Sequence, residues 1–284
     1  MREARLTCLS AQYGNEANLQ ALAQINNNIP ILLLTSVYLK LLSTKIGASN
    51  ILFSSRDCYY LSRLFNLLRE QARWNIASEY FYTSRICRTS PSDSYLKYFQ
   101  SRASPNTLVV DLAGTGWSLE QLYEKAGVTP HTFLLHHLSN SPLKERYQQI
   151  QKSEKSIIPF SMLDGLPLDN SQLETVNYVD SGMVLDVLVV DGYDSAIPVL
   201  EYPNYPKSTV NVIRNIESTH ELFANVLAHF DLPALVHEIE ASADKIAGVV
   251  AELYKHLCDT NSSMRDLALY HARQDRRTMW KLKK

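Results

Sequence analysis

The spacing of apolar residues along the chain changes in an orderly way between residues 16 and 139. Short continuous apolar runs, typical of strands buried on both faces, alternate with segments whose apolar residues recur every three or four positions, as on one face of a helix. The predicted strands are 51–55, 79–84, 107–111 and 131–139, and the predicted helices are 16–46, 61–68, 93–101 and 119–127. This alternation predicts an α/β fold in which helices flank both faces of a parallel sheet.

Two prolines and a change in the hydrophobic pattern mark further boundaries along the chain. Pro30 predicts a kink or break in the first helix, because proline lacks the amide hydrogen that an interior helical position uses. Residues 173–203 alternate as in strands and predict a β-rich insert, and the chain after Pro206 has helical spacing. A sequence typical of a capping box at 218–221 predicts the start of a helix there.

These patterns predict two segments that pack on one another. Residues 1–160 would form the α/β domain, and residues 161–284 a β-rich segment followed by a helical cap. The second segment contains four aspartates among apolar residues, which suggest either a metal site or an ordinary turn at 190–195; they are Asp180, Asp186, Asp191 and Asp194.

The composition and charge of the chain bear on which classes of binding partner it has. The chain has 284 residues, 45% of them hydrophobic and 20% charged, with a net charge of -1, so nothing in the charge balance indicates nucleic acid. The longest apolar stretch contains Lys40 and is shorter than the roughly 20 residues of a membrane span. The four cysteines match no zinc spacing and no apolar leader is present, which predicts a cytoplasmic protein. A basic tail at 273–284 is compatible with a protein partner or with a solvated helix end.

Polar clusters lie at the ends of three of the predicted strands. The clusters are Ser54-Ser55-Arg56-Asp57, Thr83-Ser84-Arg85 with Arg88 just beyond, and Asp111 with Gly114, Thr115, Gly116, Trp117 and Ser118. Because ligands bind at the carboxyl ends of parallel strands, we expect the three clusters to share one crevice. A local ion pair or helix cap at Arg56 and Asp57 is the alternative for the first cluster.

The loop at 114–118 has the features of a phosphate site. It opens a helix, where free amide N–H groups and the positive end of the helix dipole attract an anion. Guanidinium groups from Arg85 and Arg88 would bind further phosphate oxygens through charge-assisted hydrogen bonds. A plain tight turn is the alternative interpretation of this loop.

The segment VVDLAGTGWS resembles the loop with which type I phosphoribosyltransferases bind phosphoribosyl pyrophosphate. Asp111 matches the second acid of that motif, residues 115–118 match its 5′-phosphate cradle, and Val110 stands where the family has its first acid. The resemblance implies transfer at an anomeric carbon. Asp111 would hold ribose hydroxyls or stabilise positive charge, while Mg²⁺ with Arg56 or Arg85 would neutralise the departing diphosphate.

Two further resemblances bear on function. The segment DLAGT is similar to the nucleophile motif of haloacid dehalogenase phosphatases, with Ala113 in place of the usual acid/base aspartate. The order of short motifs also resembles an uncharacterised phosphoribosyltransferase-like domain found beside dehalogenase-type domains in bacterial surface-polysaccharide loci. Its landmarks here are Arg56-Asp57, Ser84-Arg85-Ile86-Cys87-Arg88, Asp111 to Gln121, Leu173-Glu174, Gly182 and Pro198.

The function predicted from these patterns is binding of a phosphorylated sugar or nucleotide and Mg²⁺-assisted transfer of a glycosyl or phosphoribosyl group. Asp111, Arg56 and Asp57 are the candidate catalytic residues, and Arg85, Arg88 and residues 114–118 are candidates for substrate binding. No metal ligand is assigned. Two alternatives stay open: a non-catalytic sensor with a degenerate site, and a phosphohydrolase with Asp111 as nucleophile.

Overall fold

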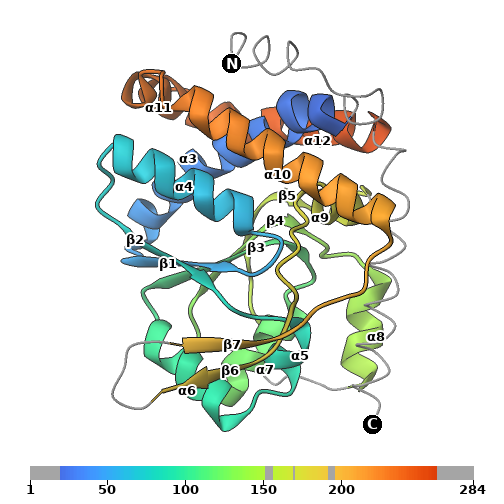
Figure 1. Ribbon diagram of the computed structural model, residues 1–284. Coiled ribbons are helices and arrows are strands. Elements are labelled where there is room, and N and C mark those ends of the chain that lie inside the picture. The colour runs from blue at the N-terminus through green and yellow to red at the C-terminus, as the bar shows by residue number, and fades with distance from the viewer. Residues whose placement is uncertain (1–19, 151–155, 169, 191–195, 261–284) are drawn as a thin grey trace.

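A five-stranded parallel sheet forms the centre of the protein (Figure 1). The computed structural model describes residues 20–150, 156–168, 170–190 and 196–260. The sheet has the order β2-β1-β3-β4-β5, and its strands are β1 (Asn50–Ser54), β2 (Ala77–Phe81), β3 (Thr107–Gly114), β4 (His131–His137) and β5 (Phe160–Asp164). All of its strand pairs are parallel, which confirms the predicted α/β class.

Helices follow each of the first four strands and cover both faces of the sheet (Figure 1). They are α4 (Tyr59–Gln71), α5 (Arg85–Thr89), α6 (Asp93–Arg102), α7 (Trp117–Ala126) and α8 (Pro142–Ile150). Neighbouring residues of β1 enter different cores: Ile51 and Phe53 pack with α4, and Leu52 packs with α6 and α7. Burial on both faces explains why the strands read as continuous apolar runs.

The N-terminal helix is continuous through Pro30, so of the predicted kink or break the break is wrong. A π-helical turn, η1 (Gln24–Asn28), leads directly into α3 (Ile29–Ile46), and Pro30 occupies the first turn of α3. A π turn rearranges the backbone hydrogen bonds just where proline has no donor to offer. The helix Gln20–Ile46 is long and apolar enough to cross a membrane by length and composition, yet 56% of its most apolar window is buried within the protein, as in a core helix.

The segment predicted to be β-rich contains one helix and one hairpin. Helix α9 (Asn170–Val176) comes first, followed by the antiparallel strands β6 (Met183–Val189) and β7 (Ala196–Glu201). Most of the predicted turn at 190–195 lies outside the described residues, and so does the whole of the basic tail at 273–284.

The chain after Pro206 is helical, as predicted, through α10 (Lys207–Leu227), α11 (Leu232–Glu240), η2 (Ala243–Lys245) and α12 (Ile246–Thr260). The predicted helix start at 218–221 is wrong, because α10 already begins at Lys207. Thr219 is buried inside that helix, and its hydroxyl donates to the Asn215 carbonyl one turn earlier. A Ser/Thr hydroxyl bonded in this way sits in a helix interior and caps nothing.

The two predicted segments share one core. The boundary between residues 160 and 161 falls inside β5, so the second segment supplies a strand to the sheet of the first. Tyr254 and Leu257 of α12 belong to the same hydrophobic cluster as Leu39 of α3 and Leu163 of β5.

Candidate functional site

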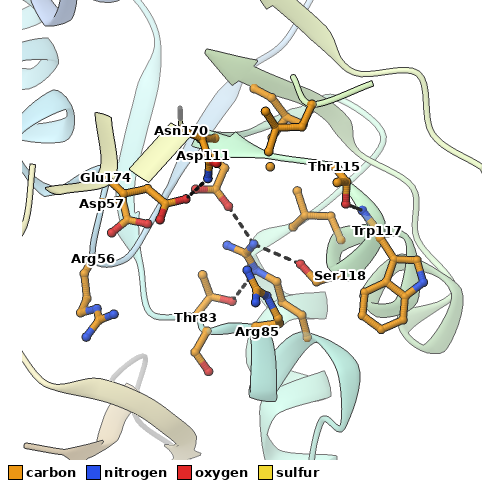
Figure 2. Close-up of a pocket in the computed structure, with 18 of the residues that line it drawn as sticks. Arg56, Asp57, Thr83, Arg85, Asp111, Thr115, Trp117, Ser118, Asn170 and Glu174 are labelled. Atoms are coloured by element: carbon orange, nitrogen blue, oxygen red, sulfur yellow. Dashed lines mark hydrogen bonds and ion pairs between the residues drawn. The ribbon is translucent and has the colours of Figure 1, made fainter. Parts of the chain in front are cut away.

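A cleft opens at the carboxyl ends of β1, β2 and β3 (Figure 2). Strand β1 lies between β2 and β3, so the connections from β1 and β3 leave the sheet at the point where the strand order reverses, which is where open α/β sheets bind ligands. Strands β1 and β2 end level, since Ser54 pairs with Phe81, and Phe53 pairs with Val110, the residue before Asp111. The volume of the cleft is about 160 Å³, which suits a small polar ligand.

All ten residues that the sequence proposed for a site line this cleft. They are Arg56, Asp57, Arg85, Arg88, Asp111, Gly114, Thr115, Gly116, Trp117 and Ser118. Local sequence order placed each cluster after a strand, and the parallel sheet brings the clusters together.

An ion pair forms the floor of the cleft. Arg88 Nη1 donates to Asp111 Oδ2 at 2.7 Å, and the two side chains are only 8% and 11% exposed. The remaining contacts hold the pair in place: Arg88 Nε donates to Thr83 Oγ1 at 3.1 Å, and the amide of Leu112 donates to Asp111 Oδ1 at 3.0 Å. Burial lowers the pKa of Arg88, but the Asp111 carboxylate outweighs it together with smaller contributions, and the pKa is raised overall. Arg88 therefore positions Asp111.

Asp57 presents a second carboxyl group to the cleft. It follows β1 in a loop that contains a cis peptide bond between Ser55 and Arg56. Its Oδ1 atom is buried without a hydrogen-bond partner among the described residues. Burial raises the pKa of Asp57 to about 6; Arg56 opposes this shift, and the nearby Asp111 carboxylate adds to it. A carboxyl group of this kind can exchange a proton near neutral pH.

The loop before α7 supplies a row of amide donors. Gly116 caps the helix in a left-handed conformation, with φ at 80°. The amide N–H groups of Thr115, Gly116 and Ser118 donate to no residue that the structure describes. With the positive end of the α7 dipole behind them, these groups form a cradle for an anion.

Two arginines border the cleft, and each is held by a tyrosine. Arg56 Nη1 donates to the Tyr178 hydroxyl at 2.7 Å, and its guanidinium lies 4.7 Å from the centre of that ring. Arg85 Nη1 donates to the Tyr147 hydroxyl at 2.7 Å, with 5.3 Å from guanidinium to ring centre. Tyr147 also stacks on Trp117, with ring centroids 4.8 Å apart. The tyrosines fix the direction of both guanidinium groups.

Sequence reasoning missed several residues of the site. Asn170 and Glu174 of α9 line the cleft, and Asn170 Nδ2 donates to Glu174 Oε1 at 2.9 Å (Figure 2). Glu174 did carry a signal, because it is one of the landmarks of the family resemblance, but the β-rich interpretation of that segment hid its helix. Nothing in the sequence pointed to Tyr147 or Tyr178, which come from outside the three clusters.

Three carboxyl groups line the cleft and bear on the predicted use of Mg²⁺: those of Asp57, Asp111 and Glu174. Within the described ranges, no group of three or more His, Cys, Asp or Glu side chains could hold a metal ion. The Asp111 carboxylate is already engaged by Arg88 and by a backbone amide. The roles described below are those of side chains and backbone amides, and Mg²⁺ stays a prediction from the resemblance.

Comparisons with known proteins do not extend this picture. No family model matches the chain, and no curated protein matches it. The function is argued from the geometry of the cleft.

Proposed function

We propose that the cleft binds a phosphorylated sugar or nucleotide and that the protein transfers its glycosyl group at the anomeric carbon, with diphosphate as leaving group. One observation carries the proposal: the amide cradle of residues 115–118 and the guanidinium groups of Arg56 and Arg85 line the same cleft. Backbone amides at a helix start and oriented arginines are two independent means of binding phosphate. Their combination favours a ligand with two phosphorylated positions.

The cradle would hold the terminal phosphate of the sugar. The free amides of Thr115, Gly116 and Ser118 would donate to its oxygens. The Ser118 hydroxyl also lines the cleft and accepts from Arg88 Nη1 at 3.5 Å. Leu134 and Ile157 pack beneath Gly116, so the loop rests on the hydrophobic core. A rigid cradle would fix the sugar relative to the carboxylates.

Bond breaking at the anomeric carbon would develop charge at both ends of the broken bond. The carbon–oxygen electron pair leaves with the diphosphate, whose negative charge Arg56 and Arg85 would neutralise. Positive charge develops on the sugar, near the Asp111 carboxylate that Arg88 holds in place. The acceptor forms the new bond to the carbon and loses a proton, which Asp57 would accept.

The contacts of Asp111 favour the transferase over the phosphohydrolase. A nucleophilic carboxylate needs an oxygen directed at phosphorus, whereas both oxygens of Asp111 accept hydrogen bonds from the protein. The position two residues on, where a dehalogenase-type enzyme has its acid/base aspartate, is the apolar Ala113. A non-catalytic sensor is the second candidate, favoured by the buried Val110 in place of the first acid.

A ligand screen followed by a turnover assay tests the proposal. Phosphoribosyl pyrophosphate, nucleotides, nucleotide sugars, diphosphate and phosphate would each be added with and without Mg²⁺, and the unfolding temperature measured, since a ligand that binds the native state raises it. The best ligand would then be incubated with the protein while diphosphate release is followed. Stabilisation by a phosphorylated sugar with diphosphate release supports the transferase, stabilisation without release supports the sensor, and no stabilisation by any of these compounds contradicts both.

A further inference from the structure

A second cavity lies between α4 and α10, on the helical side of the protein. Its volume is about 340 Å³, and it shares no lining residue with the cleft. Its lining consists of Ile29, Tyr60, Arg63, Leu64, Asn66, Leu67, Glu70, His220, Phe223 and Ala224. This size and a mostly apolar wall with a few polar groups are characteristic of small-molecule sites.

Two stacked rings form one part of the wall. The rings of Tyr60 and His220 have centroids 3.9 Å apart and planes inclined by only 9°. Burial lowers the pKa of His220 to about 3, and the charge of Arg63 acts in the same direction. His220 is therefore a neutral imidazole at physiological pH, with one donor and one acceptor nitrogen.

The hydrogen bonds of Gln24 determine which nitrogen is the acceptor. Gln24 Nε2 donates to the Val176 carbonyl at 2.7 Å, which fixes Oε1 as the acceptor end of the amide. His220 Nε2 lies 3.1 Å from that Oε1 and must therefore donate its hydrogen. This leaves Nδ1 as an acceptor, and it bonds to no described residue.

The pocket also offers a donor. The Asn66 Oδ1 atom accepts from the Ser78 hydroxyl at 2.7 Å, and the amide Nδ2 of Asn66 donates to no described residue. One acceptor and one donor therefore lie among apolar side chains such as Leu64 and Phe223. We propose that this pocket binds a flat nitrogen heteroaromatic molecule of one or two rings, whose own N–H and ring nitrogen pair with His220 and Asn66.

The same hydrogen bonds connect the pocket to the cleft. Gln24 joins His220 to the carbonyl of Val176, the last residue of α9, and α9 carries Glu174 into the cleft. A ligand that restrains His220 should also restrain Gln24 and the end of α9. The pocket is thus a second site whose occupancy stabilises one wall of the first.

Titration with simple compounds tests this site without relying on the function of the cleft. The probes are imidazole, pyrazole, benzimidazole, indazole, adenine and hypoxanthine, each of which has a ring N–H and an acceptor ring nitrogen, and binding is followed by calorimetry on the full chain. Ala224→Leu fills the pocket, and Ala228→Leu makes the same change on the exposed residue that follows α10. His220→Phe keeps a ring beside Tyr60 and removes the acceptor.

We expect at least one probe to bind the wild-type protein and the Ala228→Leu variant equally, and to bind both pocket variants about ten-fold more weakly or worse, as for loss of one good contact. Circular dichroism would confirm that each variant is folded. Hydrogen exchange should slow in residues 170–176 when the probe is bound. Absence of binding by all six probes, or binding that Ala224→Leu leaves unchanged, would overturn the site. Unchanged exchange in residues 170–176 on binding would overturn the connection to the cleft.

Discussion

Arg88 of α5 and Asp111 of β3 form a buried ion pair beneath the cleft, with 2.7 Å between Nη1 and Oδ2. The pair joins the connection that follows β2 to β3, on the other side of β1, and its geometry depends on Thr83 and on the amide of Leu112. Removing one member of such a pair leaves an uncompensated charge away from water.

The ion pair gives a prediction about stability. Arg88→Met should lower the free energy of unfolding by about 3–5 kcal/mol, because the Asp111 carboxylate stays buried without its partner. Urea denaturation measures this difference. The double variant Arg88→Met with Asp111→Leu should regain most of the stability, and a double variant as unstable as Arg88→Met alone would show that the pair is not the cause.

The arginines at the border of the cleft give a prediction about affinity. Arg85→Ala should weaken binding of diphosphate about ten-fold or more, since a charge-assisted hydrogen bond contributes about 1.5–3 kcal/mol. Arg102→Ala is the matched control, because Arg102 also lies over a tyrosine ring, 4.4 Å from the centre of Tyr98, but does not line the cleft. Calorimetry should find that Arg102→Ala binds diphosphate as tightly as the wild-type protein. Equal losses of diphosphate affinity in both variants would show that Arg85 does not bind diphosphate in the cleft.

The cradle can be tested by comparing the two glycines that flank α7. Gly116 and Gly127 both have left-handed backbones, with φ at 80° and 68°. Changing either to alanine should lower stability by a similar amount, about 1–2 kcal/mol, because a Cβ is disfavoured in that conformation. Only Gly116→Ala should also weaken diphosphate binding, since it displaces the amides that face the anion. Diphosphate affinity that is the same in the two variants would count against the cradle.

Asp57 gives a prediction about pH dependence. If Asp57 accepts a proton during transfer, the rate should rise with pH through the region around its pKa of about 6. Asp57→Asn should lower kcat and remove this dependence while diphosphate still binds. A pH–rate profile with the same rise in the variant would exclude Asp57 as the group responsible.

The same residue should affect stability with a defined sign. Because the pKa of Asp57 is raised in the folded state, folding takes up a proton between pH 3.8 and about 6, and stability falls as pH rises through that window. Asp57→Asn should therefore stabilise the protein at pH 8 by on the order of 1–3 kcal/mol and have little effect at pH 3. Urea denaturation at the two pH values measures this difference, with Asp93→Asn on the exposed first turn of α6 as the control.

Asp111 separates the transferase from the hydrolase. Asp111→Asn should lower the transfer rate about 100-fold or more by weakening charge stabilisation, and the wild-type protein should never carry phosphate. Intact mass measured during turnover with phosphoribosyl pyrophosphate checks the second point. A phosphate trapped on Asp111 would establish the hydrolase in place of the transferase.

The positions of the three polar clusters were accessible from the sequence because they depend on local patterns. Apolar runs marked the strands, the residues that follow them marked the strand ends, and parallel topology implied one shared edge. This pattern predicts that Asp57, Arg85 and Gly116 lie at one edge of the sheet, and in the structure all three line one cleft.

The pairing of side chains could not be derived in the same way. Arg88 forms its ion pair with Asp111, 23 positions away, and Arg56 donates a hydrogen bond to Tyr178, 122 positions away. Such contacts depend on how distant segments of the chain pack against the sheet, and the spacing of apolar residues does not specify this packing. Helix α9 shows this limit, because its short, partly apolar sequence is compatible with a strand. In the folded protein the segment packs on the core as a helix and carries Glu174 to the cleft.

Tertiary packing and burial determined two further features, the start of α10 and the pKa of Asp57. The spacing of residues 218–221 matches a capping box, but tertiary packing extends α10 back to Lys207 and places Thr219 in its interior. Likewise, the composition of the loop after β1 says nothing about the pKa of Asp57, which rises because the folded protein removes water from the carboxyl group. The sequence by itself determined the alternation of the first four strands with helices and the chemistry at the strand ends, since both follow from neighbouring residues. It did not predict β5, α5 or α8. Only the tertiary structure decided which of those groups are paired, desolvated or directed at a ligand, because desolvation and long-range contacts exist only once the chain is folded.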